Sequence, residues 1–194
     1  MFLLCFLLAG LAIGLLRGGS LRGLAGIQLR HTWLILVGLL LQVIAFSDFF
    51  AELPEHDAAA RALYVLSNAV VIGGLCLNLH LPPLRLLLAG AVANTTAIVA
   101  NGGYMPASPD ALRAAGMLRQ LEGMTAAGHL NNSLLGGNQT HLPLLTDIFA
   151  IPAGLPLANV FSIGDVLIGL GAMWLVAQAM VDSGETPPST IVHY

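Results

Sequence analysis

Two aspartates, Asp147 and Asp165, are the side chains of this chain best suited to do chemistry together. Asp165 lies at the mouth of the last apolar segment, where a carboxylate is costly unless it is paired, hydrogen-bonded or hydrated. If the residues between them fold back, both carboxylates reach the same membrane boundary. Two close carboxylates can share a proton and activate a water molecule, because the pKa of one of them is forced up.

The same aspartates also fit a structural role. Ser162 and Asp165 stand at the start of a predicted helix, where a hydroxyl caps the backbone and a carboxylate is favoured by the positive end of the helix dipole. Asp147 could likewise accept hydrogen bonds from loop amides. Spacing alone leaves both interpretations open: a shared polar site, or two separate caps.

A second candidate site is the motif Asn101-Gly-Gly-Tyr-Met-Pro106. Gly102 and Gly103 allow positive φ angles and a close backbone approach. One interpretation is a helix end followed by a turn that leads into Tyr104. The other is that Asn101 caps or binds a group at the site.

Two histidines in the same region, His129 and His141, could bind a metal ion together with Asp147. No short spacing of metal-ligating residues supports such a site, so we expect no metal and keep His141 only as a candidate for a binding or structural site. We also expect no cofactor. All seven basic residues are arginine, and the lack of lysine excludes Schiff-base chemistry and a Walker-type phosphate lysine.

The composition indicates a membrane protein. Of 194 residues, 57% are hydrophobic and only 9% are charged, against about 25% charged in soluble domains. The net charge of −3 argues against nucleic-acid binding, which requires a basic face. The expected partners are therefore the lipid bilayer and possible further membrane protein subunits, with no nucleic acid.

Apolar segments predict an all-α, five-span transmembrane helical bundle in a single domain, residues 1–182, followed by a tail at 183–194. Spanning a bilayer takes about 20 residues. The predicted spans are 1–16, 32–50, 63–79, 84–100 and 163–181. The segment 101–162 between the last two spans is too apolar to be disordered, so we expect a partly helical extracytoplasmic loop or lid.

The arginines predict the orientation, because basic loops stay in the cytoplasm. Arg17, Arg22 and Arg30 follow the first span, and Arg85 lies between the third and fourth. We therefore expect a multi-pass protein of the cell membrane with its amino terminus outside and its carboxyl terminus in the cytoplasm.

Three asparagines, Asn68, Asn78 and Asn94, fall within the predicted spans. Such side chains form hydrogen bonds between helices that are worth about 0.6 kcal/mol each. They could also line a polar path if they face one another.

Several motifs together resemble the bacterial membrane family known as domain of unknown function 5317. They are Leu16-Arg-Gly-Gly-Ser-Leu21, Leu40-Leu-Gln42, Asn101-Gly-Gly-Tyr-Met-Pro106, Thr140-His-Leu-Pro-Leu-Leu-Thr-Asp147 and Asn159-Val-Phe-Ser-Ile-Gly-Asp165. This resemblance covers most of the chain. It implies a multi-spanning membrane protein and carries no established activity.

The carboxyl-terminal third also resembles type II signal peptidases, which are intramembrane aspartyl proteases. That resemblance covers about a fifth of the chain, and Asn101, Asp147 and Asp165 are its matching residues. It implies an aspartate pair at the outer membrane face, although Asp147 here follows a long loop instead of a span.

Two functions follow as expectations. The first is a non-catalytic accessory or assembly subunit of a larger membrane complex, because the chain is small, apolar and without a cofactor motif. The second is an intramembrane hydrolase that uses Asp147 and Asp165 on a lipid or lipoprotein at the outer membrane face.

Overall fold

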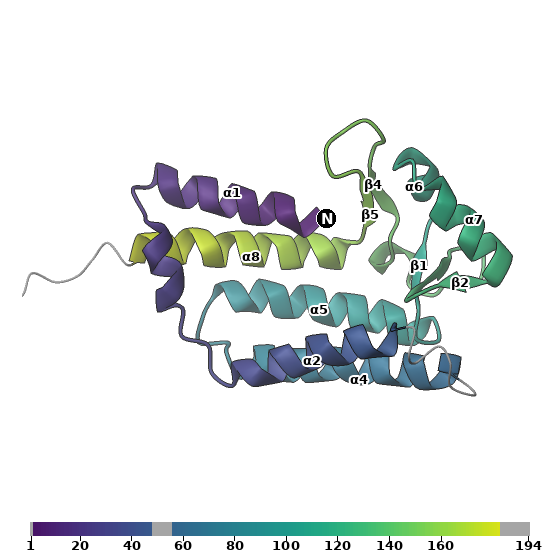
Figure 1. Ribbon diagram of the computed structural model, residues 1–194, viewed down its shortest axis with the longest axis horizontal. Helices are drawn as coiled ribbons and strands as arrows, with labels where there is room; N and C mark the ends of the chain where they lie inside the picture. Colours follow the sequence, from purple (N-terminus) through teal and green to yellow (C-terminus); the bar gives the residue numbers. More distant parts are fainter. Residues whose placement is uncertain (1, 48–55, 183–194) are drawn as a thin grey trace, which may run out of the picture.

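The computed structural model describes residues 2–47 and 56–182 and contains a row of long apolar helices. They are α1 (Phe2–Leu16), α2 (Thr32–Ala45), α4 (His56–Cys76), α5 (Pro83–Ala100) and α8 (Ile163–Asp182). In the row, α1 packs on α8, α8 on α5, α5 on α4, and α4 on α2 (Figure 1). The first and last helices of the row, α1 and α2, therefore form its two edges.

Glycines allow the closest of these helix contacts. A side chain at Gly10 would meet the backbone of Met173 on α8, at 2.7 Å from its carbonyl oxygen. Gly90 of α5 faces the backbone of Gly164 on α8 in the same way. Small residues let helix backbones approach closely, so these glycines hold α8 between α1 and α5 within one chain.

The prediction of five spans is not supported. In the described part of the chain, three helices are long and apolar enough to cross a membrane: Asp57–Cys76, Pro83–Ala100 and Ile163–Val181. Helices α1 and α2 have 15 and 14 residues. At 1.5 Å per residue they are about 22 Å long, shorter than the roughly 30 Å hydrocarbon core.

Two span boundaries also differ from the prediction. Helix α2 ends at Ala45, whereas the predicted span continued to residue 50, and 48–50 lie outside the described residues. Helix α4 begins at His56, seven residues before the predicted start at 63, because polar residues in its first turns hide the helix from hydropathy alone.

The outer segment contains strands, which corrects the all-α prediction. Its elements are β1 (Met105–Ala107), α6 (Pro109–Ala114), α7 (Leu118–Ala127), β2 (His129–Leu130), β3 (Ser133–Leu135), η2 (Pro143–Leu145), β4 (Phe149–Ile151) and β5 (Asn159–Phe161). Strand β3 lies between β1, which is parallel to it, and β2, which is antiparallel. Strands β4 and β5 form a separate antiparallel pair.

The outer segment is a packed lid with its own small core. Ser108 caps α6 through its side-chain oxygen, which accepts a hydrogen bond from the Ala111 amide at 3.4 Å. Gly116, with a φ of +71°, separates α6 from α7. Leu112 and Met124 from these helices are buried together against Ala107 of β1. The lid therefore buries part of its apolar side chains, while others, such as Leu144 and Leu155, are exposed.

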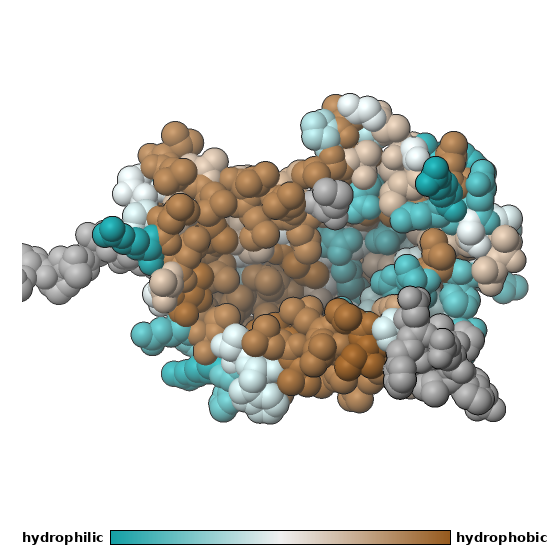
Figure 2. Space-filling view, in the orientation of Figure 1, coloured by the Kyte–Doolittle hydropathy of each residue, from teal (hydrophilic) through white to brown (hydrophobic). Residues whose placement is uncertain are grey.

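The two ends of the bundle differ in chemistry. The lid covers one end of the helices, and Figure 2 shows it as a mostly hydrophilic region beside the hydrophobic helices. At the other end a short 3-10 helix, η1 (Leu21–Gly26), follows α1 and packs against α8. There the amide of Ser20 donates a hydrogen bond to the Met180 carbonyl at 2.9 Å. The connection between α1 and α2, which carries Arg17 and Arg30, lies at this end, as does the first turn of α5, which carries Arg85 (Figure 1).

Candidate functional site

Asp165 sits in a hydrogen-bonded network at the start of α8. The Ser162 amide donates to Asp165 Oδ2 at 3.0 Å, and the Asp165 amide donates to Ser162 Oγ at 3.0 Å. This reciprocal pair is a capping box with aspartate at its fourth position. Asn94 of α5 joins it, since its Nδ2 donates to Asp165 Oδ1 and its Oδ1 accepts from Ser162 Oγ, both at 2.8 Å.

Asp147 is held in place by backbone hydrogen bonds and does not cap a helix. It pairs with Ala107 at the edge of β1 in a parallel bridge. Its amide donates to the Pro106 carbonyl at 3.0 Å, and its carbonyl accepts from the Ser108 amide at 2.9 Å. These hydrogen bonds involve only the backbone of Asp147. Its side-chain Oδ1 is buried and has no hydrogen-bond partner in the described structure.

Burial and, to a smaller extent, the charge of Asp165 together raise the pKa of Asp147 to about 7. A buried carboxyl group without a partner favours its neutral form, because the charged form loses its hydration. The two aspartates therefore have different surroundings. Asp165 has fixed donors on both oxygens, while one oxygen of Asp147 has none.

Both aspartates line one cavity between the bundle and the lid, with a volume of about 600 Å³. Figure 2 shows the hollow, with hydrophilic surface at its lid end and hydrophobic surface along the helices. The lid contributes Asn132 and Asn159, and the helices contribute Asn68 and Asn94. From the sequence, Asp147 and Asp165 could form either a shared polar site or two separate caps. In the structure Asp165 caps α8, and both aspartates also line the same cavity.

The walls of the cavity along the helices are apolar. Leu39 of α2, Val71 of α4 and Leu87 of α5 line it, together with Ile168 of α8. Leu3 of α1 lines it from the other edge of the helix row. The cavity is thus amphipathic, with polar groups at the lid and hydrocarbon further along the helices.

Tyr64 links the bundle to the lid beside the aspartates. It is 7% exposed, and its hydroxyl oxygen accepts a hydrogen bond from Asn132 Nδ2 at 3.1 Å. On the same helix, Asn68 Nδ2 donates to the Tyr64 carbonyl. Sequence reasoning missed Tyr64, Asn132 and Asn159 as site residues, because these side chains meet only through contacts between distant segments. The polarity of Asn68 and Asn94 within apolar segments was a usable signal.

The first residues of the motif that begins at Asn101 lie outside the cavity, whereas its Met105 lines the cavity. Asn101 Nδ2 donates to the His141 carbonyl, and the His141 amide donates to Asn101 Oδ1, both at 2.9 Å. Gly102 and Gly103 have φ angles of +72° and +93° and form the turn after α5. Asn101 therefore fastens a loop of the lid to the end of α5, and His141 contributes only backbone atoms to this fastening.

Tyr104 belongs to another cluster that joins the lid to α4. Its ring stacks on His129 at a centroid distance of 4.8 Å, and the Arg61 guanidinium carbon lies 5.5 Å from the Tyr104 centroid. His129 Nε2 lies 3.4 Å from Asp57 Oδ2. Burial raises the pKa of Tyr104. Among residues 2–47 and 56–182, no three histidine, cysteine or acidic side chains gather as metal ligands.

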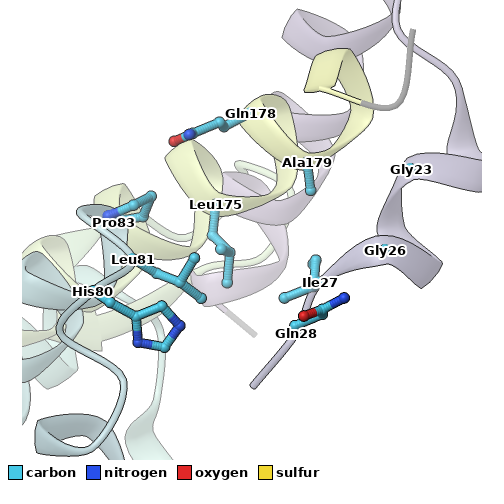
Figure 3. Close-up of a pocket in the computed structure, with 10 residues that line it drawn as sticks. All are labelled: Gly23, Gly26, Ile27, Gln28, His80, Leu81, Pro83, Leu175, Gln178 and Ala179. Atoms are coloured by element: carbon cyan, nitrogen blue, oxygen red, sulfur yellow. The ribbon is translucent and has the colours of Figure 1, made fainter. Parts of the chain in front are cut away.

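A second pocket lies at the opposite end of the helices, between η1 and the ends of α5 and α8 (Figure 3). Its volume is about 380 Å³, and Leu81 and Leu175 point into it. Gln28, His80 and Gln178 are its polar side chains, and none of its lining residues is acidic. It therefore lacks the chemistry of the cavity at Asp147.

Comparison with known proteins gives a family and no activity. No curated protein and no solved structure matches the chain, so the resemblance to type II signal peptidases is not confirmed. Residues 26–177 match a family described as being of unknown function, DUF5317. This match extends from η1 almost to the end of α8 and includes both aspartates and Asn94. The chain therefore belongs to the DUF5317 family.

Proposed function

We propose that this protein is a multi-pass protein of the cell membrane whose lid lies on the extracytoplasmic side. Support comes from the three helices that are long and apolar enough to span a membrane. The lid lies at one end of the helix row, whereas Arg17, Arg30 and Arg85 lie in or next to the short connections at the other end. The lid also contains Arg113 and Arg119, but it is a long segment, and long segments are translocated largely regardless of their charge. Because basic loops are retained in the cytoplasm, this separation favours an outer lid.

We further propose that the protein hydrolyses a lipid or lipoprotein in the cavity beneath the lid. The observation that carries this proposal is the pair of unlike carboxyl groups, Asp147 and Asp165, on one amphipathic cavity. Acid and base roles are typically divided between titratable groups whose surroundings differ in this way. The apolar walls fit an acyl chain, and the polar end fits the bond to be cleaved.

The proposed reaction assigns one role to each aspartate. Asp165, in its ionised form, accepts a proton from a water molecule as the water oxygen bonds to the substrate carbonyl carbon. Two acceptor positions remain on this carboxylate beyond the bonds from Asn94 and Ser162. Asp147, in its protonated form, donates its proton to the leaving group as the scissile bond breaks. Water is consumed, and an acid and an alcohol or amine are released.

The direct test is turnover of a membrane extract by the purified full-length chain, followed by mass spectrometry. We expect new products with the wild-type protein and none with Asp147→Asn or Asp165→Asn. Asp110→Asn is the matched control, since Asp110 lies in the same lid but is exposed and paired with Arg113 at 2.7 Å. Equal product from all four proteins would overturn the proposal.

The accessory or assembly role is the second candidate, and one observation favours it. Each oxygen of Asp165 accepts one hydrogen bond, from Asn94 or from the Ser162 amide, as the oxygens of a purely structural carboxylate would. The test is to crosslink the protein in its native membrane and then purify it in mild detergent. A partner that copurifies with wild type and with Asp165→Asn supports this role, whereas a monomer without partners counts against it.

A further inference from the structure

Amides are the most numerous polar side chains of the cavity. Six amide side chains line it: Gln42, Asn68, Asn94, Gln120, Asn132 and Asn159. Among the described residues that line the cavity, none is an arginine, a lysine or a histidine, and the acidic ones are Asp147 and Asp165. Any formal charge that this lining carries is therefore negative.

Such a lining is unsuited to phosphate. Proteins bind phosphate with arginine, lysine or the free amides of a helix N-terminus. The N-terminus of α8 lies beside the cavity, but two amides at this end donate hydrogen bonds within the chain. The Asp165 amide donates to Ser162 Oγ, and the Ser162 amide donates to Asp165 Oδ2. The carboxylate of Asp165 thus occupies the position that a phosphate would take.

The same lining suits hydroxyl groups. Each amide side chain offers both donors and an acceptor, as a hydroxyl group does, so the two can pair without a charged partner. Asp147 Oδ1 is buried without a partner, and a hydroxyl group in the cavity would supply one. The cavity volume of about 600 Å³ lies within the range of small-molecule sites and accommodates a headgroup with the beginning of an acyl chain.

We propose that this cavity selects a membrane lipid with an uncharged, hydroxyl-bearing headgroup and excludes lipids with a phosphate headgroup. The inference rests on the proposed function only in placing a lipid in the cavity. It requires no turnover, so binding and hydrolysis can be tested separately.

The test is photolabelling of the full-length protein in phosphatidylcholine nanodiscs. The probes are diacylglycerol and phosphatidic acid with identical diazirine-bearing acyl chains. We expect diacylglycerol to label peptides that contain Leu39 or Leu87 at least tenfold more than phosphatidic acid does. Equal labelling, or stronger labelling by phosphatidic acid, would overturn the selectivity while leaving the hydrolase proposal standing. Selective labelling without any turnover would overturn the hydrolase proposal alone.

A charge substitution tests the cause of the selectivity. Gln120 lies in the lid, lines the cavity and is half-buried, so a longer side chain there can reach the polar end. We expect Gln120→Arg to raise labelling by phosphatidic acid to within threefold of diacylglycerol. A ratio unchanged in Gln120→Arg would overturn exclusion by charge. Gln178→Leu, in the pocket at the opposite end, is the control and should leave the ratio unchanged.

Discussion

The two ends of the helix row each contain an asparagine that bonds to a distant segment, but the partners differ. At the end opposite the lid, Asn78 is fully buried and bonds to backbone only: to the amide and carbonyl of Arg30 at 2.6 and 2.7 Å, and to the Gly74 carbonyl. At the lid end, Asn94 bonds to the side chains of Asp165 and Ser162.

This difference distinguishes an asparagine that only holds a loop in place from one that belongs to a candidate functional site. An asparagine that satisfies backbone groups fixes a loop, and any change of side chain in that loop leaves the bonds intact. An asparagine that bonds to a carboxylate fixes the position of a reactive group beside a cavity. Asn101 resembles Asn78 in this respect, because its partner is the backbone of His141. The lid end therefore contains both kinds of asparagine, and Asn94 is the one in the cavity.

An activity measurement should show the largest difference between the two ends of the helix row. We expect Asp147→Asn or Asp165→Asn to reduce hydrolysis by about 100-fold or more, since a positioned acid or base contributes roughly 10²–10⁴-fold. Gln178→Leu, in the second pocket, should stay within about twofold of wild type. Initial rates of product release by mass spectrometry would check this. Equal losses at both ends would mean that the chemistry does not belong to the cavity.

Unfolding measurements sharpen the contrast between the two asparagines. Asn78→Ala should lower the free energy of unfolding by about 3 kcal/mol, because three hydrogen bonds are lost and buried backbone groups stay unpaired. Asn94→Ala should cost about 1–2 kcal/mol, because Asn94 is only half-buried. Activity should show the reverse order, with folded Asn78→Ala close to wild type and Asn94→Ala impaired. Chemical denaturation in detergent gives the first quantity.

The pH dependence of stability tests the surroundings of Asp147. Its pKa is raised to about 7 in the folded protein, so the folded state binds more protons than the unfolded state between about pH 4 and 7. Stability should therefore fall as the pH rises, by about 2 kcal/mol between pH 5 and 8, and level off above that range. Thermal unfolding of wild type and Asp147→Asn at both pH values would measure it. The variant should lose most of the slope; an identical slope would place its origin elsewhere.

The smallest effect is expected at Asn101. Asn101→Ala removes two hydrogen bonds to a partly exposed loop and should cost about 1 kcal/mol. The loop 136–141 should become more open to protease, while hydrolysis stays near the wild-type rate. Limited proteolysis followed by mass spectrometry would detect the change. A large loss of activity in this variant would instead connect Asn101 to the cavity.

Sequence patterns found the apolar helices and the two aspartates but not the cavity that unites them. Hydropathy located the starts of α2, α5 and α8 closely, because long apolar runs leave few alternatives to a buried helix. It also predicted spans at α1 and α2, which the lengths of these helices do not support. Tyr64 and Asn132 could not be paired from the sequence, because 68 residues separate them and the contact requires the folded lid. The capping role of Asp165 was readable, because it depends only on Ser162 nearby.

The shortness of α1 and α2 has a consequence for the surrounding bilayer. These helices form the two edges of the row, and Leu3 and Leu39 on them line the cavity. On the proposed membrane placement, both are about 8 Å shorter than a hydrocarbon core of about 30 Å. Hydrophobic mismatch of this kind is relieved by local thinning of the bilayer. Lipid headgroups beside the two edges would then sit deeper than elsewhere, so a lipid would need to move less far out of its leaflet to reach Asp147.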